Sequence, residues 1–216
     1  MKPSLDTAIH LLHAVSAGTL ATNSAQLQGY PFATALPFVP DERHCPVFLI
    51  SRLAEHTKNV TADSRTSFLV STPNDANVLT GARMTLVGDA VRVDATPALS
   101  ARYARYQPDA EQYLGLGDFA FFRLTPKRIR HIAGFGQMGW IEESDWTDVG
   151  VLSLEEEARC LHELIGFQQP GVRLLGIDCY GCDIEHHGKR DRLRFGAMVS
   201  SPAKMIEAVK RLLAVL

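Results

Sequence analysis

The segment PVFLISRLAEHTKNVTADSRTSFLV, residues 46–70, joins two short apolar runs through one polar stretch. Both runs are rich in β-branched and aromatic residues, which favours strands, and the stretch between them predicts one short helix over residues 53–63. Similar runs occur at residues 18–22, 30–39 and 83–93, separated by glycine, proline, asparagine and aspartate. Strands with so little helix between them are typical of an antiparallel barrel or sandwich, not of a doubly wound parallel sheet.

Composition places the chain among ordinary globular proteins. Its 216 residues are 46% hydrophobic and 21% charged, with a formal net charge of −2. That balance gives no field of one sign that would attract nucleic acid or a membrane surface, so neither partner is expected. No apolar stretch reaches the roughly 18 residues that span a bilayer, and the N-terminal segment lacks the apolar core of a signal peptide. With only four cysteines, we expect a cytoplasmic protein with reduced thiols.

The rest of the chain predicts a second unit. Two further strands are expected at residues 119–126 and 128–135, with the TPK sequence as the turn between them. An acidic, polar stretch at residues 142–152 marks a boundary. The sequence therefore predicts a domain over residues 1–145 and a small α+β domain over residues 150–216.

Donors suited to an anion gather where the strand ending at Ser51 runs into the short helix. A phosphate requires hydroxyl and amide donors and a cation, ideally at a helix N-terminus. Ser51, His56, Thr57 and Lys58 provide these groups, and Arg83 begins a later strand that would reach the same anion if the two strands were neighbours. The alternative is a solvated helix start with an unrelated arginine at a strand end.

The order of several motifs resembles a known family. GTLAT, YPFATALPFV, the segment that opens this section, RMTLVGDAVRV and FFRLTPKRIRHIAGFGQMGWI follow one another as in the pyridoxamine 5′-phosphate oxidase-like FMN-binding split barrels. The nearest subgroup is similar to the haem-utilisation proteins of the HugZ type, through LAEHTKN, RMTLVG and GFG. The resemblance covers residues 4–142. The tail, residues 153–216, is similar to a small α/β domain that often follows this barrel.

The resemblance implies a mainly β fold with helices (α+β): a six-stranded antiparallel split β-barrel that forms a homodimer and binds FMN at the dimer interface. The phosphate of FMN would be held by Ser51, Arg52, His56, Thr57 and Lys58. Arg83 would reach the flavin edge or the phosphate. Thr34 stands where the oxidases keep a phosphate-binding arginine, and Val39 replaces a second basic residue. These two departures argue against pyridoxamine 5′-phosphate oxidation.

Haem is the alternative cofactor, and it requires a neutral imidazole as axial ligand. The sequence HHGKR, residues 186–190, makes His186 and His187 the candidates, although it also suits a solvated hairpin turn. The other histidines are expected to be structural or solvated. His10 and His13 are placed on a helix surface or dimer contact, His44 in a solvated turn, and His131 in a half-buried, hydrogen-bonded position.

Two further motifs give no chemistry. Cys179 and Cys182 form a C-x-x-C between two predicted strands, where a β-turn is a better interpretation than a redox pair or a zinc site. Gly134, Gly136 and Gly139 have dinucleotide-motif spacing but do not begin a helix.

The sequence thus predicts an FMN-dependent oxidoreductase acting on an unidentified small molecule. A haem-degrading protein and a non-enzymatic flavin or haem carrier are the alternatives. No catalytic residue and no metal site are predicted.

Overall fold

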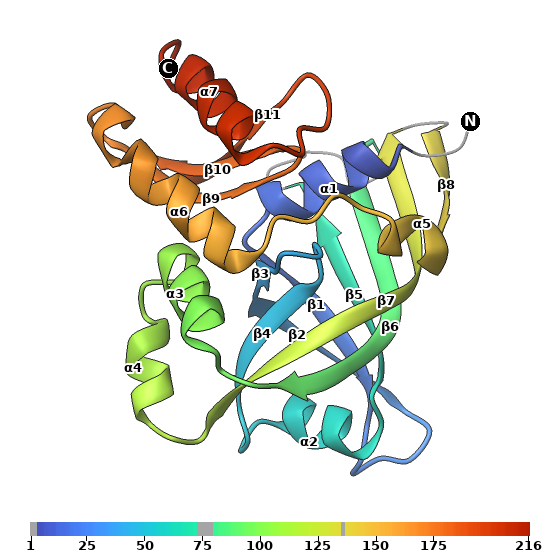
Figure 1. Ribbon diagram of the computed structural model, residues 1–216. Coiled ribbons are helices and arrows are strands. Elements are labelled where there is room, and N and C mark those ends of the chain that lie inside the picture. Colours follow the sequence, from blue (N-terminus) through green and yellow to red (C-terminus); the bar gives the residue numbers. More distant parts are fainter. Residues whose placement is uncertain (1–3, 73–79, 135–136) are drawn as a thin grey trace.

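The computed structural model describes residues 4–72, 80–134 and 137–216 (Figure 1). The helices are α1 (Leu5–Ala14), α2 (Glu55–Ala62), α3 (Pro97–Tyr106), α4 (Ala110–Gly115), α5 (Glu143–Thr147), α6 (Leu154–Leu164), the 3₁₀ helix η1 (Ile165–Phe167) and α7 (Pro202–Leu213). The strands are β1 (Ala17–Asn23), β2 (Pro31–Pro37), β3 (Val39–Pro40), β4 (Pro46–Ser51), β5 (Arg65–Ser71), β6 (Arg83–Val93), β7 (Phe119–Gly134), β8 (Gln137–Glu142), β9 (Val172–Asp178), β10 (Gly181–His186) and β11 (Lys189–Arg194).

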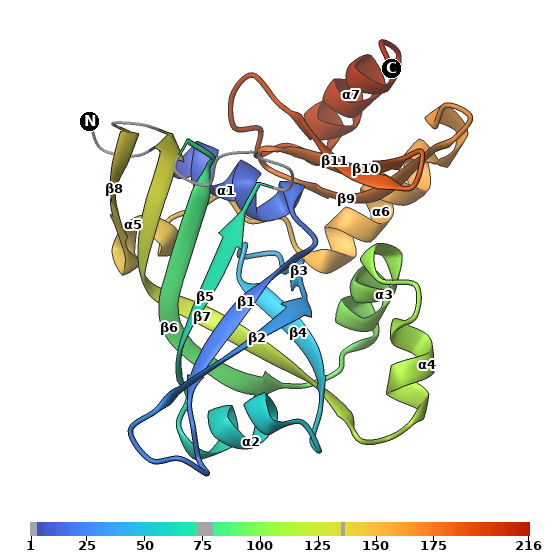
Figure 2. The ribbon, with the colours of Figure 1, turned by 180° about the vertical axis from the view of Figure 1, so that it is seen from behind.

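The larger sheet is a curled, antiparallel half-barrel, which confirms the predicted split barrel (Figures 1 and 2). Its strands follow the order β2-β1-β5-β6-β7-β4-β3, and β8 adds to β7. Among the described residues this sheet has eight strands, not the expected six, because a two-residue strand (β3) and β8 join its edges. Strand β7 lies between β4 and β6, so residues at the ends of β4 and β6 are not on neighbouring strands.

The expected turn at residues 125–127 is wrong, because β7 runs unbroken through it. The register between β6 and β7 shifts at this point, from Val87 opposite Arg128 to Gly88 opposite Pro126, which leaves Lys127 as an extra residue. Such a bulge accommodates a proline, which cannot donate a ladder hydrogen bond. Gly88 permits the close approach, since a Cβ atom there would lie 2.0 Å from the carbonyl oxygen of Thr125.

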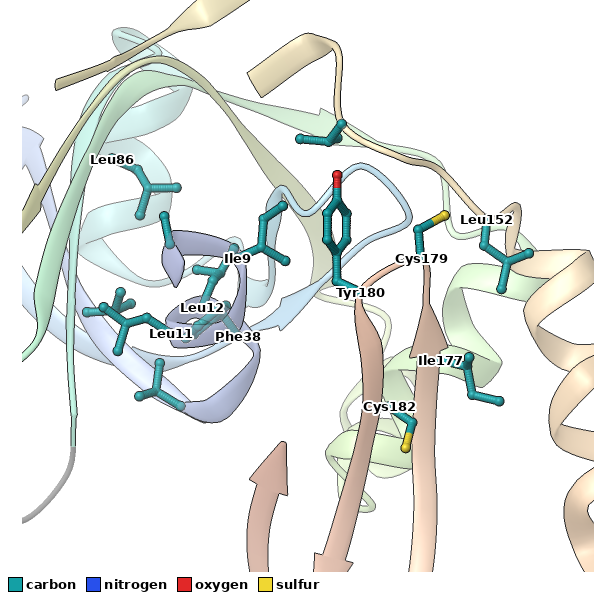
Figure 3. Close-up of a cluster of buried hydrophobic side chains, with 14 of the residues drawn as sticks. Ile9, Leu11, Leu12, Phe38, Leu86, Leu152, Ile177, Cys179, Tyr180 and Cys182 are labelled. Carbon is teal, nitrogen blue, oxygen red and sulfur yellow. The ribbon is translucent and has the colours of Figure 1, made fainter. Parts of the chain in front are cut away.

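The barrel core is closed at one end by α1 (Figure 3). Ile9 and Leu12 point from α1 into the barrel and are fully buried. Below them, Phe68 packs edge-to-face against Phe38 and Phe48, with ring centroids 5.0 and 4.9 Å apart. The opposite end of the barrel is covered by α2, so the polar segment noted in the sequence lies at the end distant from the C-terminal sheet.

The second sheet, in the order β11-β10-β9, packs with α6 and α7 beside the α1 end of the barrel (Figure 1). The hydrophobic core continues from the barrel into this unit. Buried Glu157 of α6 also pairs with Arg102 and Arg105 of α3. The division into domains 1–145 and 150–216 therefore stays a prediction.

The β9–β10 turn is formed by Cys179 and Tyr180. Cys179 and Cys182 lie apart along the hairpin (Figure 3), and burial raises the thiol pKa values of these residues to about 11 and about 12. Neither thiol is therefore activated for redox chemistry. In the described parts of the chain, every helix is too short or too polar to span a bilayer.

Candidate functional site

The candidate site is a groove between α2 and the neighbouring ends of β6 and β7. It has a volume of about 900 Å³, which falls in the range of cofactor-binding sites. Its apolar wall is formed by Val60, Ala90, Val91, Ala120 and Phe122, and its cations are Arg52, Lys58 and Arg92. The groove therefore combines an apolar surface with positive charge, as a flat amphipathic anion requires.

Two of the three cations are uncommitted. Arg52 donates from Nη2 to the carbonyl oxygen of Gly117 at 3.0 Å. Among the described residues, the side chains of Lys58 and Arg92 have neither an ion-pair partner nor a hydrogen-bond acceptor. An anion in the groove would thus meet two cations that do not have to leave another partner.

Polar groups at the start of α2 add to this. Thr57 lines the groove, and its buried Oγ1 has no hydrogen-bond partner in the described part of the chain. The neighbouring His56 has an equally unpartnered, buried Nε2, and burial lowers the pKa of its imidazole, which favours the neutral ring. Ser51 differs, because its hydroxyl donates to Asp118 and accepts from the amide of Leu53. Ser51 therefore shapes the turn into α2 and has little capacity left for a ligand.

Arg83 and Thr34 lie outside this groove within one chain. Arg83 begins β6 opposite Ile132, whereas Arg92 lies near the other end of β6, opposite Phe122. Nine residues of extended strand separate the two arginines by about 30 Å. The sequence argument brought Arg83 to the anion only if β4 and β6 were neighbours, and β7 lies between them. Thr34 is half-buried on β2, where it pairs with Leu20 of β1.

His186 and His187 form the tip of the β10–β11 hairpin. Their rings stack with centroids 4.1 Å apart, and His187 has a φ of 51°. The hairpin belongs to the unit at the opposite end of the barrel from α2 (Figure 1). Within one chain, neither imidazole can therefore reach the groove beside α2.

A second groove, of about 920 Å³, lies beside the start of β5 and includes Asn23, Gln28 and Arg65. Its arginine is committed, because Arg65 pairs with Asp63 at 2.5 Å. The groove with Lys58 and Arg92 is therefore the better site for an anion. The sequence analysis missed Arg92; its place in the strand RMTLVGDAVRV was visible, but its proximity to α2 depends on the sheet order.

Comparisons with known proteins bear on the family. The family described as "CREG, beta-barrel" matches residues 3–148. The chloroplastic heme oxygenase HOZ of Arabidopsis thaliana is 35% identical over 126 residues, which are 57% of this chain and 38% of that protein. The chain thus spans well under half of the length of that relative.

Solved structures share the fold. A protein of unknown function from Agrobacterium tumefaciens matches with a TM-score of 0.73 and 25% identity, over 97% of this chain and 93% of that chain. A heme-binding protein from Mycobacterium smegmatis matches over the full length of both chains, with a TM-score of 0.61 and 22% identity. The heme storage protein HutZ of Vibrio cholerae matches over 66% of this chain and 95% of that chain, with a TM-score of 0.50 and 21% identity.

The family match covers about two thirds of the chain and coincides with the curled sheet, from α1 to α5. The barrel resemblance seen in the sequence therefore holds at the level of the fold, whereas the matching family is not the FMN-binding one. The chain belongs to the CREG β-barrel family.

Proposed function

We propose that this protein binds haem in the groove beside α2 and takes part in haem breakdown. The observation that carries the proposal is the pairing of an apolar wall with the uncommitted cations Lys58 and Arg92. The heme oxygenase HOZ and the two heme proteins of similar fold support it.

The donor set fits the chemistry of haem. A porphyrin ring is apolar and carries two propionates, so it needs an apolar surface next to cations. Val91 and Phe122 would contact the ring, while Lys58, Arg92 and the Thr57 hydroxyl would hold the carboxylates. Bound haem would supply an iron that activates oxygen, and the chain would orient the ring and keep water from its apolar face.

A side chain that would hold the haem iron would have to come from elsewhere, because none of the described residues that line the groove is His, Cys, Met or Tyr. His186 and His187 remain the candidates. Since they lie at the opposite end of the molecule from the groove, they could bind the iron only from a second subunit. A His186→Ala, His187→Ala double variant would then change the spin state of the bound iron. Its affinity for haem should change little, because the groove supplies most of the contacts.

Haemin titration tests the groove. We expect a Soret shift that saturates at one haem per chain, and a loss of about 100-fold or more in affinity in a Lys58→Ala, Arg92→Ala double variant, because charged hydrogen bonds contribute about 1.5–3 kcal/mol each. Lys204→Ala, which removes an exposed lysine on α7, is the matched control and should bind like the wild type. Wild-type affinity in the double variant would place haem elsewhere, and no saturable binding in the wild type would exclude the function.

FMN is the second candidate, favoured by the unpartnered Thr57 hydroxyl beside Arg52 and Lys58 at the start of α2. Flavin fluorescence quenching during an FMN titration distinguishes it from haem.

If haem binds, adding a reductant and oxygen distinguishes an enzyme that breaks haem down from a protein that only carries it. Loss of the Soret band with release of iron indicates an enzyme, whereas a stable band indicates a non-enzymatic carrier.

We also propose a homodimer. On one face of the barrel sheet, Leu69 and Val87 are each 42% exposed, and the small residues Ala21, Ala33 and Ala35 share this face, separated from them by Thr19 and Ser67. Exposed apolar side chains among small residues favour a protein interface. It offers a route by which a second subunit could complete the site.

A further inference from the structure

A second cluster of functional side chains lies at the junction of the barrel and the small sheet, away from the groove. His13 comes from the last turn of α1, His44 from the turn between β3 and β4, and Asp178 from the end of β9. The sequence analysis placed His13 on a helix surface or dimer contact and His44 in a solvated turn. Both predictions are wrong, because His13 and His44 are fully buried within one chain, and Asp178 is 5% exposed. The C-terminal unit covers both histidines, and no local sequence pattern predicts that burial.

One nitrogen or oxygen atom from each of these three residues lies within 4.8 Å of the others. The two facing ring nitrogens, His13 Nε2 and His44 Nδ1, lie 2.9 Å apart. Asp178 Oδ2 lies 3.5 Å from the other nitrogen of His13, Nδ1, so this carboxylate is beside the ring and has to move towards the facing nitrogens to bind the same ion. The set of two imidazoles and one carboxylate is a common one for divalent transition metals.

The outer nitrogen of each ring already has the partner that a metal-binding histidine needs. His13 Nδ1 lies 2.8 Å from the carboxylate of Asp183, and His44 Nε2 lies 3.3 Å from the carbonyl oxygen of Gly150. Metal-binding histidines nearly always donate their other N–H to a carboxylate or a carbonyl. With both outer nitrogens protonated, the two inner nitrogens present lone pairs to each other.

Counting protons shows why this arrangement calls for a cation. The line from Asp183 through His13 and His44 to Gly150 contains three close contacts between two groups that only accept. Three contacts need three protons, whereas two neutral imidazoles carry two. A metal ion between the inner nitrogens satisfies the line without the third proton.

The two oxygens of the Asp178 carboxylate are held differently. Its Oδ1 accepts from the amide of Tyr180 at 2.7 Å and from Arg192 at 2.8 Å. Its buried Oδ2 makes no hydrogen bond of acceptable geometry with the described residues, although Arg192 Nη1 lies 2.8 Å away as an ion pair. Arg192 is shared with Asp183, and the guanidinium of Arg190 also acts electrostatically on Asp183. The two carboxylates therefore do not by themselves require a further cation, and the case for one rests on the ring nitrogens.

The backbone at His44 is strained in a way that aims this ring inward. His44 has a φ of 56°, in the left-handed region that costs about 1 kcal/mol or more for a residue other than glycine. Asp41 stabilises the turn by accepting from the amides of Arg43 and Cys45, both at 2.8 Å. Strain held in place by such bonds is typical of a functional position.

We propose that His13, His44 and Asp178 bind one divalent transition-metal ion, with zinc as the reference ion, and that this ion joins the barrel to the small sheet. Zinc would take His13 Nε2, His44 Nδ1 and Asp178 Oδ2, with a fourth position left for water. Zinc–nitrogen bonds of about 2.0–2.1 Å in tetrahedral geometry require the inner nitrogens to separate by about 0.5 Å. Because the ion bridges three distant segments, it stabilises the folded chain.

The test uses the full chain, purified from zinc-supplemented medium and also refolded with Co²⁺, because the buried site admits an ion only when the chain opens. We expect one zinc per chain by elemental analysis, and the visible absorption of tetrahedral cobalt. His44→Asn should lower metal affinity by about 100-fold or more. Asparagine tolerates a positive φ, so this variant should fold.

His162→Asn is the matched control, since it makes the same change at an exposed histidine of α6, away from the cluster. It should retain the metal. Two results would overturn the proposal. One is a wild-type chain with neither bound zinc nor a tetrahedral cobalt spectrum. The other is equal metal content in the wild type and in His44→Asn, which would indicate adventitious binding at surface histidines.

Discussion

At the scale of the residue, His131 shows how a side chain's surroundings set its chemistry. It lies on β7, fully buried, and neither ring nitrogen has a hydrogen-bond partner in the described part of the chain. The sequence analysis expected a half-buried, hydrogen-bonded ring. That is wrong, because the strand alternation places His131 on the core side, opposite Met84.

Burial lowers the pKa of His131 below its ordinary value of 6.5. The unfolded chain therefore takes up a proton below about pH 6.5 that the folded chain does not, and stability falls as the pH falls. We expect His131→Leu to be more stable than the wild type by about 1–3 kcal/mol at pH 8, since it removes two unsatisfied polar atoms. The difference should grow by about 1 kcal/mol at pH 5.5.

Urea unfolding at both pH values measures this. The comparison at pH 8 isolates packing, because the ring is neutral in both states there. A difference that stays constant between the two pH values would mean that His131 does not titrate on unfolding. A variant less stable at pH 8 would mean that the ring has a partner.

The same scale shows what the sequence could reveal about the site. Thr57 and Lys58 were recognised from donor chemistry next to a strand end, and the structure places both in the groove wall. Arg92 and the pair His13 and His44 were missed. Their partners lie on distant segments, and the sequence carries no local pattern for contacts that only the assembled sheets create.

At the scale of the element, β7 shows how a long strand passes a proline. Two strands and a turn were expected because TPK is typical of turns. The chain instead forms a bulge, and Gly88 on β6 provides the space that the displaced backbone needs. The expected strand at residues 83–93 matches the structure, because its pattern was not interrupted.

Gly88→Ala tests this account of the bulge. The new Cβ would lie 2.0 Å from a backbone carbonyl oxygen that cannot rotate away, so the strands must separate. We expect a loss of about 1–3 kcal/mol in the free energy of unfolding. Gly115→Ala is the control, because no atom lies within 4 Å of a Cβ there, and alanine favours the helix. Equal stability of Gly88→Ala and wild type would mean that β6 and β7 can separate freely at this point.

At the scale of the whole molecule, the arrangement of the two sheets separates the groove proposed for haem from the histidines proposed as its iron ligands. The barrel fold could be predicted because several motifs stand in a fixed order along the sequence. The position of Arg83 could not, since it depends on which strands are neighbours. The groove beside α2 and the hairpin with His186 and His187 lie at opposite ends of the folded molecule. A second subunit is the simplest way to bring such groups together.

The apolar face with Leu69 and Val87 makes this testable. We expect light scattering with size-exclusion chromatography to give twice the chain mass of 23.8 kDa. Val87→Glu should shift the protein towards the monomer, because a carboxylate buried in an apolar interface costs several kcal/mol. Leu116→Glu is the control, since it places the same charge on an exposed leucine of the α4 end, away from this face. A monomeric wild type would rule out the dimer. A Val87→Glu dimer as stable as the Leu116→Glu dimer would move the interface to another face, and the source of the axial ligand would then have to be sought there.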